Sequence, residues 1–317
     1  MSWSTKSRPK GSLPPKRSDP ALERAGAAPL RVADAMRWAM GLLSTAEVDT
    51  PRLDAELLLA HTLGCERAQV PLRWHDPLTA SFATAFTALV RRRAAREPLA
   101  YILGERPFFD ITLQVSPAVL VPRPETEHLI EAALAWAERQ PKRPLRIIDV
   151  GTGSGAIAIV LARHLAHAQV TAVDVSLEAL AVAQHNAARL GVAERITFAH
   201  SDLLRDATGL YDLIAANLPY VDRDELRTLM PEVATWEPRL ALDGGPGGLE
   251  LVARLLTELP ARLAPDGLAL LELDPRQVAR AQELARRALP QAALTVIPDL
   301  AGHARVLAIA RPAEQGA

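Results

Sequence analysis

The stretch IIDVGTGSGAIAI, residues 147–159, carries the strongest fold signal in this chain. An apolar run ends at Asp149 and Val150, glycines then occupy alternate positions, and a second apolar run follows at once. This order predicts a buried strand, a tight turn and a helix. Glycines in such a turn let a ligand approach the backbone amides that point out of the helix N-terminus.

The spacing of these glycines narrows the class of ligand. Dinucleotide-binding folds use G-x-G-x-x-G at this place, whereas this turn has G-x-G-x-G. The shorter spacing favours S-adenosylmethionine, a cationic nucleoside ligand without a pyrophosphate. A tight turn without any ligand is the alternative. The predicted cofactor-binding residues of the turn are Gly151, Thr152, Gly153, Ser154 and Gly155.

Strand and helix patterns alternate from residue 145 onward. Helical stretches separate most of seven apolar runs, which predicts an α/β fold with a doubly wound sheet and covered faces. Only a short loop joins the last two runs, and a parallel pair needs a long crossover, so the final strand should be antiparallel. The predicted strands are Leu145–Val150, Gln169–Asp174, Ile196–Ala199, Tyr211–Ala216, Gly267–Leu273, Leu294–Ile297 and Val306–Ala310.

Three segments are predicted ahead of the sheet-forming residues 123–317. Residues 1–28 are polar, basic and rich in proline, so we expect a disordered tail that cannot offset its ordering entropy. Residues 29–104 predict a small all-helical domain, and residues 105–122 a β-hairpin linker. Specific helix boundaries are a Thr-Pro start at residues 50–51, a stop at Gly64, a cap near Thr79 or Ser81, and a start at Pro124 with Glu125 and Glu127 in the first turn.

Composition and charge limit the class of protein. A length of 317 residues suggests two domains, and 49% hydrophobic residues allow a sizeable core. The net charge of −1 argues against attraction of the whole molecule to nucleic acid. The single cysteine, Cys65, can form neither a disulfide framework nor a cysteine-based zinc site, and no metal site is predicted. With no membrane span and no secretory signal in the sequence, we expect a cytoplasmic protein.

Acidic residues follow two of the predicted strands. Asp174 ends the second strand, where a carboxylate can accept hydrogen bonds from both ribose hydroxyls of a nucleoside that lies across the strand ends. Asp202 and Leu203 follow the third strand and are placed to border an adenine ring. A helix-capping role for Asp174 and a turn role for Asp202 are the alternatives.

The stretch AANLPYV, residues 215–221, ends the fourth predicted strand. Ligands of open α/β sheets bind outside the carboxyl ends of strands, so this stretch lies at a candidate site. The Asn217 side-chain oxygen and a nearby backbone carbonyl can each accept one hydrogen of a planar amide or amino group. The lone pair of that group then points toward an electrophilic methyl group. The Tyr220 ring can stack on the planar group and on a methyl-sulfonium cation. The alternative is an Asx-type turn that only closes the strand.

Several independent stretches resemble the HemK/PrmC family. They are REPLAYILGERPFF (96–109), VSPAVLVPRPETE (115–127), DVGTGSG (149–155), VDVS (173–176) and EPRLALDGGPGGLE (237–250), and the likeness extends from about residue 30 to 312.

The resemblance implies a seven-stranded, Rossmann-like class I methyltransferase domain behind the helical domain. The implied activity is transfer of a methyl group from S-adenosylmethionine to the glutamine side-chain amide in the Gly-Gly-Gln tripeptide of peptide chain release factors. The implied partner is therefore a release factor. We expect the protein to be a monomer that binds neither a membrane nor a specific nucleic acid.

The family's functional residues carry over by position. The resemblance places Gly151 to Gly155 and Asp174 at S-adenosylmethionine, and Asn217 at both cofactor and substrate. It implies a helical domain that recognises the protein substrate. The implied glutamine pocket is formed by Asn217, Leu218, Pro219 and Tyr220.

The sequence departs from the family pattern at two positions. The family usually carries N-P-P-Y, and here the second residue is Leu218; some members carry an aromatic residue where Leu203 stands. Leucine is compatible with the chemistry, because position 218 supplies a backbone carbonyl and the residue before a proline is held extended.

Other functions share part of these features. A glutamine methyltransferase of a large-subunit ribosomal protein would have the same N-x-P-Y site. An adenine amino-methyltransferase would require a basic groove and a target-recognition domain. A cofactor-sensing adaptor would not need Asn217 or Tyr220. Arg123 and Glu127 either shape the pocket for the methionine part of the cofactor or belong to a helix start.

Overall fold

The structure, a computed structural model, describes residues 30–141 and 143–313. The described residues form two compact units, one up to Ala95 and the other from Arg96 onward, which are described separately. The predicted basic tail lies outside the described residues. Within the described ranges, no helix combines the length and the apolar character that a membrane crossing requires.

Helices of the first unit pack around an apolar centre. Leu58 and Phe86 are almost completely buried there. Three predicted helix boundaries are confirmed: a helix starts at Pro51 with Thr50 as its N-cap, the same helix ends at Gly64 in the left-handed conformation, and the Thr79 hydroxyl accepts a hydrogen bond from the Phe82 N–H. The elements of this unit are α2 (Val32–Thr45), α3 (Pro51–Leu63), η1 (Arg67–Arg73) and α4 (Ala80–Ala94).

The second unit begins with a short helix, a β-hairpin and a longer helix. The predicted hairpin is present, with its two strands inside residues 105–114. The longer helix begins two residues later than predicted, because Pro124 and Glu125 form a turn. In that turn the Thr126 N–H donates to the Arg123 carbonyl, three residues back, at 3.1 Å. The elements are α5 (Leu99–Leu103), β1 (Glu105–Phe108), β2 (Ile111–Gln114) and α6 (Thr126–Ala137).

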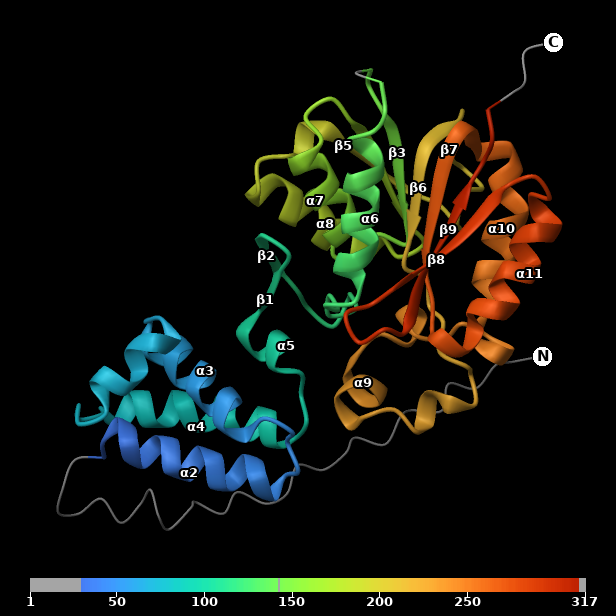
Figure 1. Ribbon diagram of the computed structural model, residues 1–317. Helices are drawn as coiled ribbons and strands as arrows, with labels where there is room; N and C mark the ends of the chain where they lie inside the picture. The colour runs from blue at the N-terminus through green and yellow to red at the C-terminus, as the bar shows by residue number, and fades with distance from the viewer. Residues whose placement is uncertain (1–29, 142, 314–317) are drawn as a thin grey trace, which may run out of the picture. The chain divides into compact units, whose positions relative to one another are not determined.

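All seven predicted strands are present in one sheet with the order β5-β4-β3-β6-β7-β9-β8 (Figure 1). The pairs from β5 to β7 are parallel. Strand β9 runs antiparallel to both of its neighbours, as predicted from the short final loop. The strands are β3 (Arg146–Val150), β4 (Gln169–Asp174), β5 (Ile196–His200), β6 (Tyr211–Ala216), β7 (Leu263–Glu272), β8 (Ala293–Pro298) and β9 (Ala304–Ala310).

Helices cover each face of the sheet. Successive strand residues point to opposite sides, so neighbouring residues pack against different helices. Ile147 packs with α6, α7 (Ala156–His164) and α8 (Leu177–Arg189). Its neighbour Ile148 packs with α10 (Glu250–Arg262) and α11 (Val278–Ala288) on the other face. Burial on both sides explains why the central strands are continuous apolar runs.

The strand order places a crevice at the centre of the sheet. The chain leaves β3 toward β4 on one side, and β6 later pairs with the other side of β3. Ligands of doubly wound folds bind at this reversal, outside the carboxyl ends of the strands. The remaining short elements are η2 (Ala193–Arg195), η3 (Glu225–Arg227), α9 (Pro231–Trp236), η4 (Arg239–Ala241), η5 (Pro246–Gly248) and η6 (Pro275–Gln277).

Candidate active site

The glycine turn after β3 has the conformation that its sequence predicted. Gly151, Gly153 and Gly155 all have positive φ angles, of 76°, 54° and 85°. A Cβ on Gly155 would lie 2.8 Å from the Ile159 side chain and 3.2 Å from Ala183 Cβ, so this glycine allows α7 and α8 to pack closely. The turn therefore requires glycine for its backbone geometry and for its packing.

Asp149 stabilises this turn by hydrogen bonds, a role that the sequence did not suggest. Its side chain is fully buried, and Oδ2 accepts hydrogen bonds from the Thr152 hydroxyl at 2.7 Å and the Ala158 N–H at 3.1 Å. Burial raises the pKa of Asp149 to about 7, although both hydrogen bonds lower it. The sequence signal for this role was an acidic residue inside the apolar run that precedes the glycine turn, three residues before a threonine.

Asp174 is fixed by backbone amides at the end of β4. Oδ2 accepts from the Gly153 N–H at 2.9 Å, and Oδ1 accepts from the Ser176 N–H at 2.8 Å. These bonds orient the carboxylate and tie it to the glycine turn. Each oxygen keeps a further lone pair for a ligand hydroxyl, which fits the predicted ribose contact.

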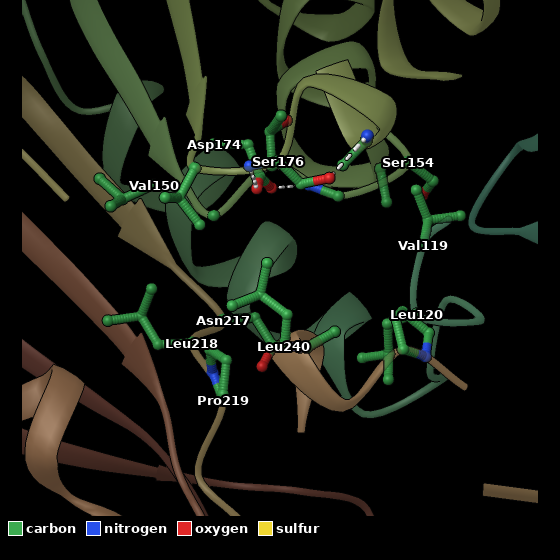
Figure 2. Close-up of a pocket in the computed structure, with 18 of the residues that line it drawn as sticks. Val119, Leu120, Val150, Ser154, Asp174, Ser176, Asn217, Leu218, Pro219 and Leu240 are labelled. Carbon is green, nitrogen blue, oxygen red and sulfur yellow. Dashed lines mark hydrogen bonds between the residues drawn. The ribbon is translucent and has the colours of Figure 1, made fainter. Parts of the chain in front are cut away.

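A cavity of about 530 Å³ opens at the carboxyl ends of the strands. Figure 2 shows Asp174 across this cavity from Asn217 and Pro219. The size and the largely apolar lining with a few polar groups suit a nucleoside that carries an amino-acid chain. Of the predicted site residues, the cavity is lined by Gly151, Thr152, Gly153, Ser154, Asp174, Asp202, Leu203, Asn217, Leu218 and Pro219; Gly155 and Tyr220 are not among the lining residues.

Asp202 and Leu203 border the cavity through an ordered turn. Leu203 is buried with a positive φ of 56°, and the Ser201 hydroxyl donates to its carbonyl at 2.9 Å. Asp202 accepts from Arg254 at 2.6 Å. The contact of these residues with an adenine ring remains a prediction.

The Asn217 amide is oriented by a residue that the sequence did not single out. Asn217 Nδ2 donates to the Thr126 hydroxyl at 2.9 Å, and within the described chain no hydrogen bond is donated to Asn217 Oδ1. Thr126 is buried at the start of α6 and lines the cavity. The acceptor oxygen of Asn217 is therefore free to accept a hydrogen bond from a ligand.

Comparison with known proteins identifies the family. Residues 34–104 match the PrmC N-terminal domain, and residues 131–264 match the Methyltransferase small domain. A release factor glutamine methyltransferase of Rhodopirellula baltica is 39% identical over 285 residues, which cover 89% of this chain and 96% of the relative. Another, of Cereibacter sphaeroides, is 42% identical over 284 residues, which cover 90% and 100%. The chain belongs to the release factor glutamine methyltransferase family.

Solved structures agree with this family assignment at the level of the fold. The hMettl16 catalytic domain in complex with MAT2A 3'UTR hairpin 1 aligns with a TM-score of 0.50 and 18% identity, over 77% of this chain and 85% of that chain. As a member of the release factor glutamine methyltransferase family, the chain is an S-adenosylmethionine-dependent methyltransferase with a class I fold.

A second glycine loop, residues 243–248, holds the backbone of the NLPY stretch in this family member. A Cβ on Gly244 would lie 2.7 Å from the Pro219 carbonyl oxygen, and one on Gly248 only 2.1 Å from the Tyr220 carbonyl oxygen. The Gln277 side chain donates to that same Tyr220 oxygen at 2.7 Å. The late stretch that resembled the family thus acts as a backbone clamp, which the sequence alone did not reveal.

Tyr220 is partly buried and is not among the residues that line the cavity. Burial, with an added contribution from Glu272, raises the pKa of the phenol to about 12, so Tyr220 is neutral at physiological pH. Its stacking on substrate or cofactor stays a prediction.

Arg123 and Glu127, the two residues with open roles, separate in the structure. Arg123 lines the cavity and donates to Glu237 at 2.6 Å. Glu237 is buried, and burial raises its pKa. Glu127 accepts from the Phe109 N–H at 2.9 Å and so fastens the hairpin to α6 instead of lining the cavity.

Proposed function

We propose that this chain methylates the side-chain amide nitrogen of the glutamine in the Gly-Gly-Gln tripeptide of peptide chain release factors. The observation that carries the proposal is the Asn217 amide, whose Nδ2 is held by Thr126 while Oδ1 remains available at the cavity. Two relatives that are 39% and 42% identical, and that align over 96% and 100% of their own length, are release factor glutamine methyltransferases.

The residues of the chain would act by orienting the substrate amide. Asn217 Oδ1 and the Leu218 carbonyl would each accept one N–H hydrogen of the glutamine, which directs the nitrogen lone pair into the cavity. The same two acceptors would stabilise the positive charge that develops on nitrogen. When bound, S-adenosylmethionine supplies an electrophilic methyl group on a sulfonium centre. The alkylated amide is acidic and would lose its proton to water, so no general base is required.

The cofactor would be held by the opposite wall of the cavity. Asp174 would accept hydrogen bonds from the ribose hydroxyls, and the glycine turn at residues 151–155 would leave room for the methionine part. Asp202 and Leu203 would border the adenine. The oriented carboxylate and the positive φ angles of the glycines support these roles.

We assign substrate recognition to the helical unit, and we expect a cytoplasmic monomer, because the proposed substrate acts in translation. The first unit carries none of the predicted cofactor residues. This distribution supports recognition as its role.

The decisive experiment is mass spectrometry of an intact release factor after incubation with the enzyme and S-adenosylmethionine. We expect one added methyl group on the peptide that contains Gly-Gly-Gln, located on the glutamine by fragmentation. A modified ribosomal protein together with an unmodified release factor would contradict the proposal and support the ribosomal alternative.

A further inference from the structure

The end of β7 carries a buried carboxylate that the mechanism above does not use. Glu272 is only 1% exposed, and among the described residues neither of its side-chain oxygens has a hydrogen-bond partner with full geometry. An unpaired buried acid costs free energy, whereas an apolar residue of similar size would not. Its presence at the base of the site calls for a role beyond stability.

Glu272 is connected to Asn217 through one intervening side chain, that of Thr126. The Thr126 hydroxyl accepts from Asn217 Nδ2 at 2.9 Å. Ala216 of β6 pairs with Leu271 of β7, so Asn217 and Glu272 are the next residues along two neighbouring strands. The Thr126 hydroxyl also lowers the pKa of the Glu272 carboxylate. The Thr126–Glu272 contact falls short of a full hydrogen bond in distance or angle. We nevertheless take the hydroxyl hydrogen to point at the carboxylate, since it rotates freely and the carboxylate is the strongest acceptor beside it.

The direction of these contacts follows from the chemistry of each group. An ionised carboxylate can only accept, so the Thr126 O–H is the donor in this contact. The Thr126 oxygen then has lone pairs left for Asn217, and only the Nδ2 end of the amide can donate to them. With Nδ2 fixed in this way, Oδ1 is the end that faces the cavity.

We propose that Glu272 is a positioning residue for methyl transfer, which acts through the Thr126 hydroxyl to keep Asn217 Oδ1 directed at the reacting nitrogen. This role rests on the proposed function, because it takes Asn217 as the residue that contacts the glutamine amide. It adds Glu272 and Thr126 to the machinery of the site.

The surroundings of Glu272 make its charge adjustable. Burial raises the pKa of Glu272 to about 7. When protonated, Glu272 could donate to Thr126, and the hydroxyl could then donate to Asn217 Oδ1, which would reverse the amide. The charged and titratable groups that face Glu272 are Arg123 and Glu125 ahead of α6, Arg305 on β9, and Tyr220 after β6.

The test compares Glu272→Met with Glu272→Gln in the full-length enzyme at saturating S-adenosylmethionine, with an intact release factor as substrate. Methionine removes the acceptor and keeps the volume, so kcat should fall at least about tenfold. The melting temperature should not fall, and the Kd for S-adenosylmethionine should stay within about twofold. A glutamine amide can accept from Thr126 through its oxygen but can also donate through its nitrogen. The kcat of Glu272→Gln should therefore lie between those of the wild type and Glu272→Met.

The pH profile supplies a readout that a purely structural role would not change. The wild-type kcat should rise as the pH increases through about 7, where Glu272 becomes ionised. Glu272→Gln should lose this rise, because it cannot titrate.

A matched pair at Thr126 protects the test against misfolding of the Glu272 variants. Thr126→Val removes the hydroxyl and should lower kcat as Glu272→Met does, whereas Thr126→Ser keeps the hydroxyl and should retain most of the rate. The double variant Glu272→Met with Thr126→Val should be no slower than the worse single variant, because both break the same path.

The outcomes separate the two proposals. If the wild-type enzyme leaves the release factor unmodified, the proposed function fails. If the wild-type enzyme is active and folded Thr126→Val and Glu272→Met both keep kcat within about twofold, the positioning role is overturned and the function stands.

Discussion

Leu218 occupies the position where the family usually carries proline, and its side chain is buried against the glycine turn. Its Cδ2 lies 3.1 Å from where a Cβ on Gly151 would stand. If the backbone carbonyl does the chemistry, Leu218→Pro should change turnover by less than about tenfold. The loss should appear mainly in the melting temperature, because a buried leucine contact is removed. Single-turnover rates and thermal unfolding of the same preparation measure both effects.

Asn217→Ala should be far more damaging than the change at Leu218. It removes the acceptor aimed at the reacting nitrogen, and the expected rise in the barrier is ~2.7–4 kcal/mol, the scale of a preorganised catalytic hydrogen bond. Cofactor affinity measured by calorimetry separates a binding loss from a rate loss. Equal rates for Leu218→Pro and Asn217→Ala, both folded, would mean that the leucine side chain shapes the pocket and that the carbonyl account is wrong.

Asp174→Ala should weaken S-adenosylmethionine binding by ~1–3 kcal/mol, the scale of hydrogen bonds to a charged group. The loss has two sources, because Asp174 also holds the N–H groups of Gly153 and Ser176. Isothermal titration of the cofactor measures the effect. Unchanged affinity would remove Asp174 from the ribose site.

At the scale of elements, the loop before α10 should tolerate alanine at one glycine and not at the next. Gly247 and Gly248 both have positive φ, of 68° and 70°, so alanine strains the backbone equally at each. A Cβ at Gly247 meets nothing within 4 Å, whereas one at Gly248 would meet the Tyr220 carbonyl oxygen at 2.1 Å. Gly248→Ala should therefore lower kcat much more than Gly247→Ala, at similar cofactor affinity. Equal kcat for the two variants would show that the clamp does not position NLPY.

The sequence predicted elements better than it predicted contacts. Seven apolar runs, most of them separated by helical patterns, were sufficient for the strands. In central strands such as β6, burial on both faces leaves a continuous apolar signal along the chain. The helix start at Pro124 was misplaced, because a proline is equally favourable in the turn that precedes a helix. Thr126 and Glu272 were missed for a different reason: Thr126 meets Asn217 across 91 positions of sequence, and no local pattern encodes such a pairing.

The candidate site divides along the same line. The glycine turn, Asp174 and Asn217 were predictable, because the few residues around each of them indicate both its chemistry and its place at the end of a strand. Asp149 acts through hydrogen bonds from the Thr152 hydroxyl and the Ala158 N–H, and the clamp at residues 243–248 packs against the backbone of Pro219 and Tyr220. Such roles depend on the folded arrangement and become visible only there.

At the scale of the whole molecule, the position of a truncation should decide whether cofactor binding survives. The second unit begins at Arg96, and Tyr101 within it donates from its hydroxyl to the Val119 carbonyl at 2.6 Å, next to the cavity lining. Removal of residues 1–95 should spare S-adenosylmethionine binding and sharply reduce turnover on an intact release factor. Removal of residues 1–104 should weaken cofactor binding as well. Calorimetry and turnover on both truncations test this, and full turnover by residues 96–317 would refute a recognition role for the helical unit.

The free energy of unfolding of the whole molecule should depend on pH through the titration of Asp149. Its pKa is raised from 3.8 to about 7 by burial, so the folded state holds a proton that the unfolded state releases. The free energy of unfolding should therefore fall as the pH rises from about 4 to about 7. Asp149→Asn cannot titrate and should flatten that part of the profile. Melting temperatures of both proteins across this range are the measurement, and parallel profiles would contradict the raised pKa.

The glycine clamp has a consequence for how such enzymes can diverge. Gly244 and Gly248 of the clamp pack closely against main-chain atoms of NLPY, the carbonyl oxygens of Pro219 and Tyr220, and leave the side chain at position 218 unconstrained by the clamp. Mutational drift at position 218 is therefore permitted as long as Gly244 and Gly248 are conserved. Across descendants of a common ancestor, exchange between proline and leucine at this position should be tolerated in catalysis at a cost in stability, while loss of either glycine should be removed by selection.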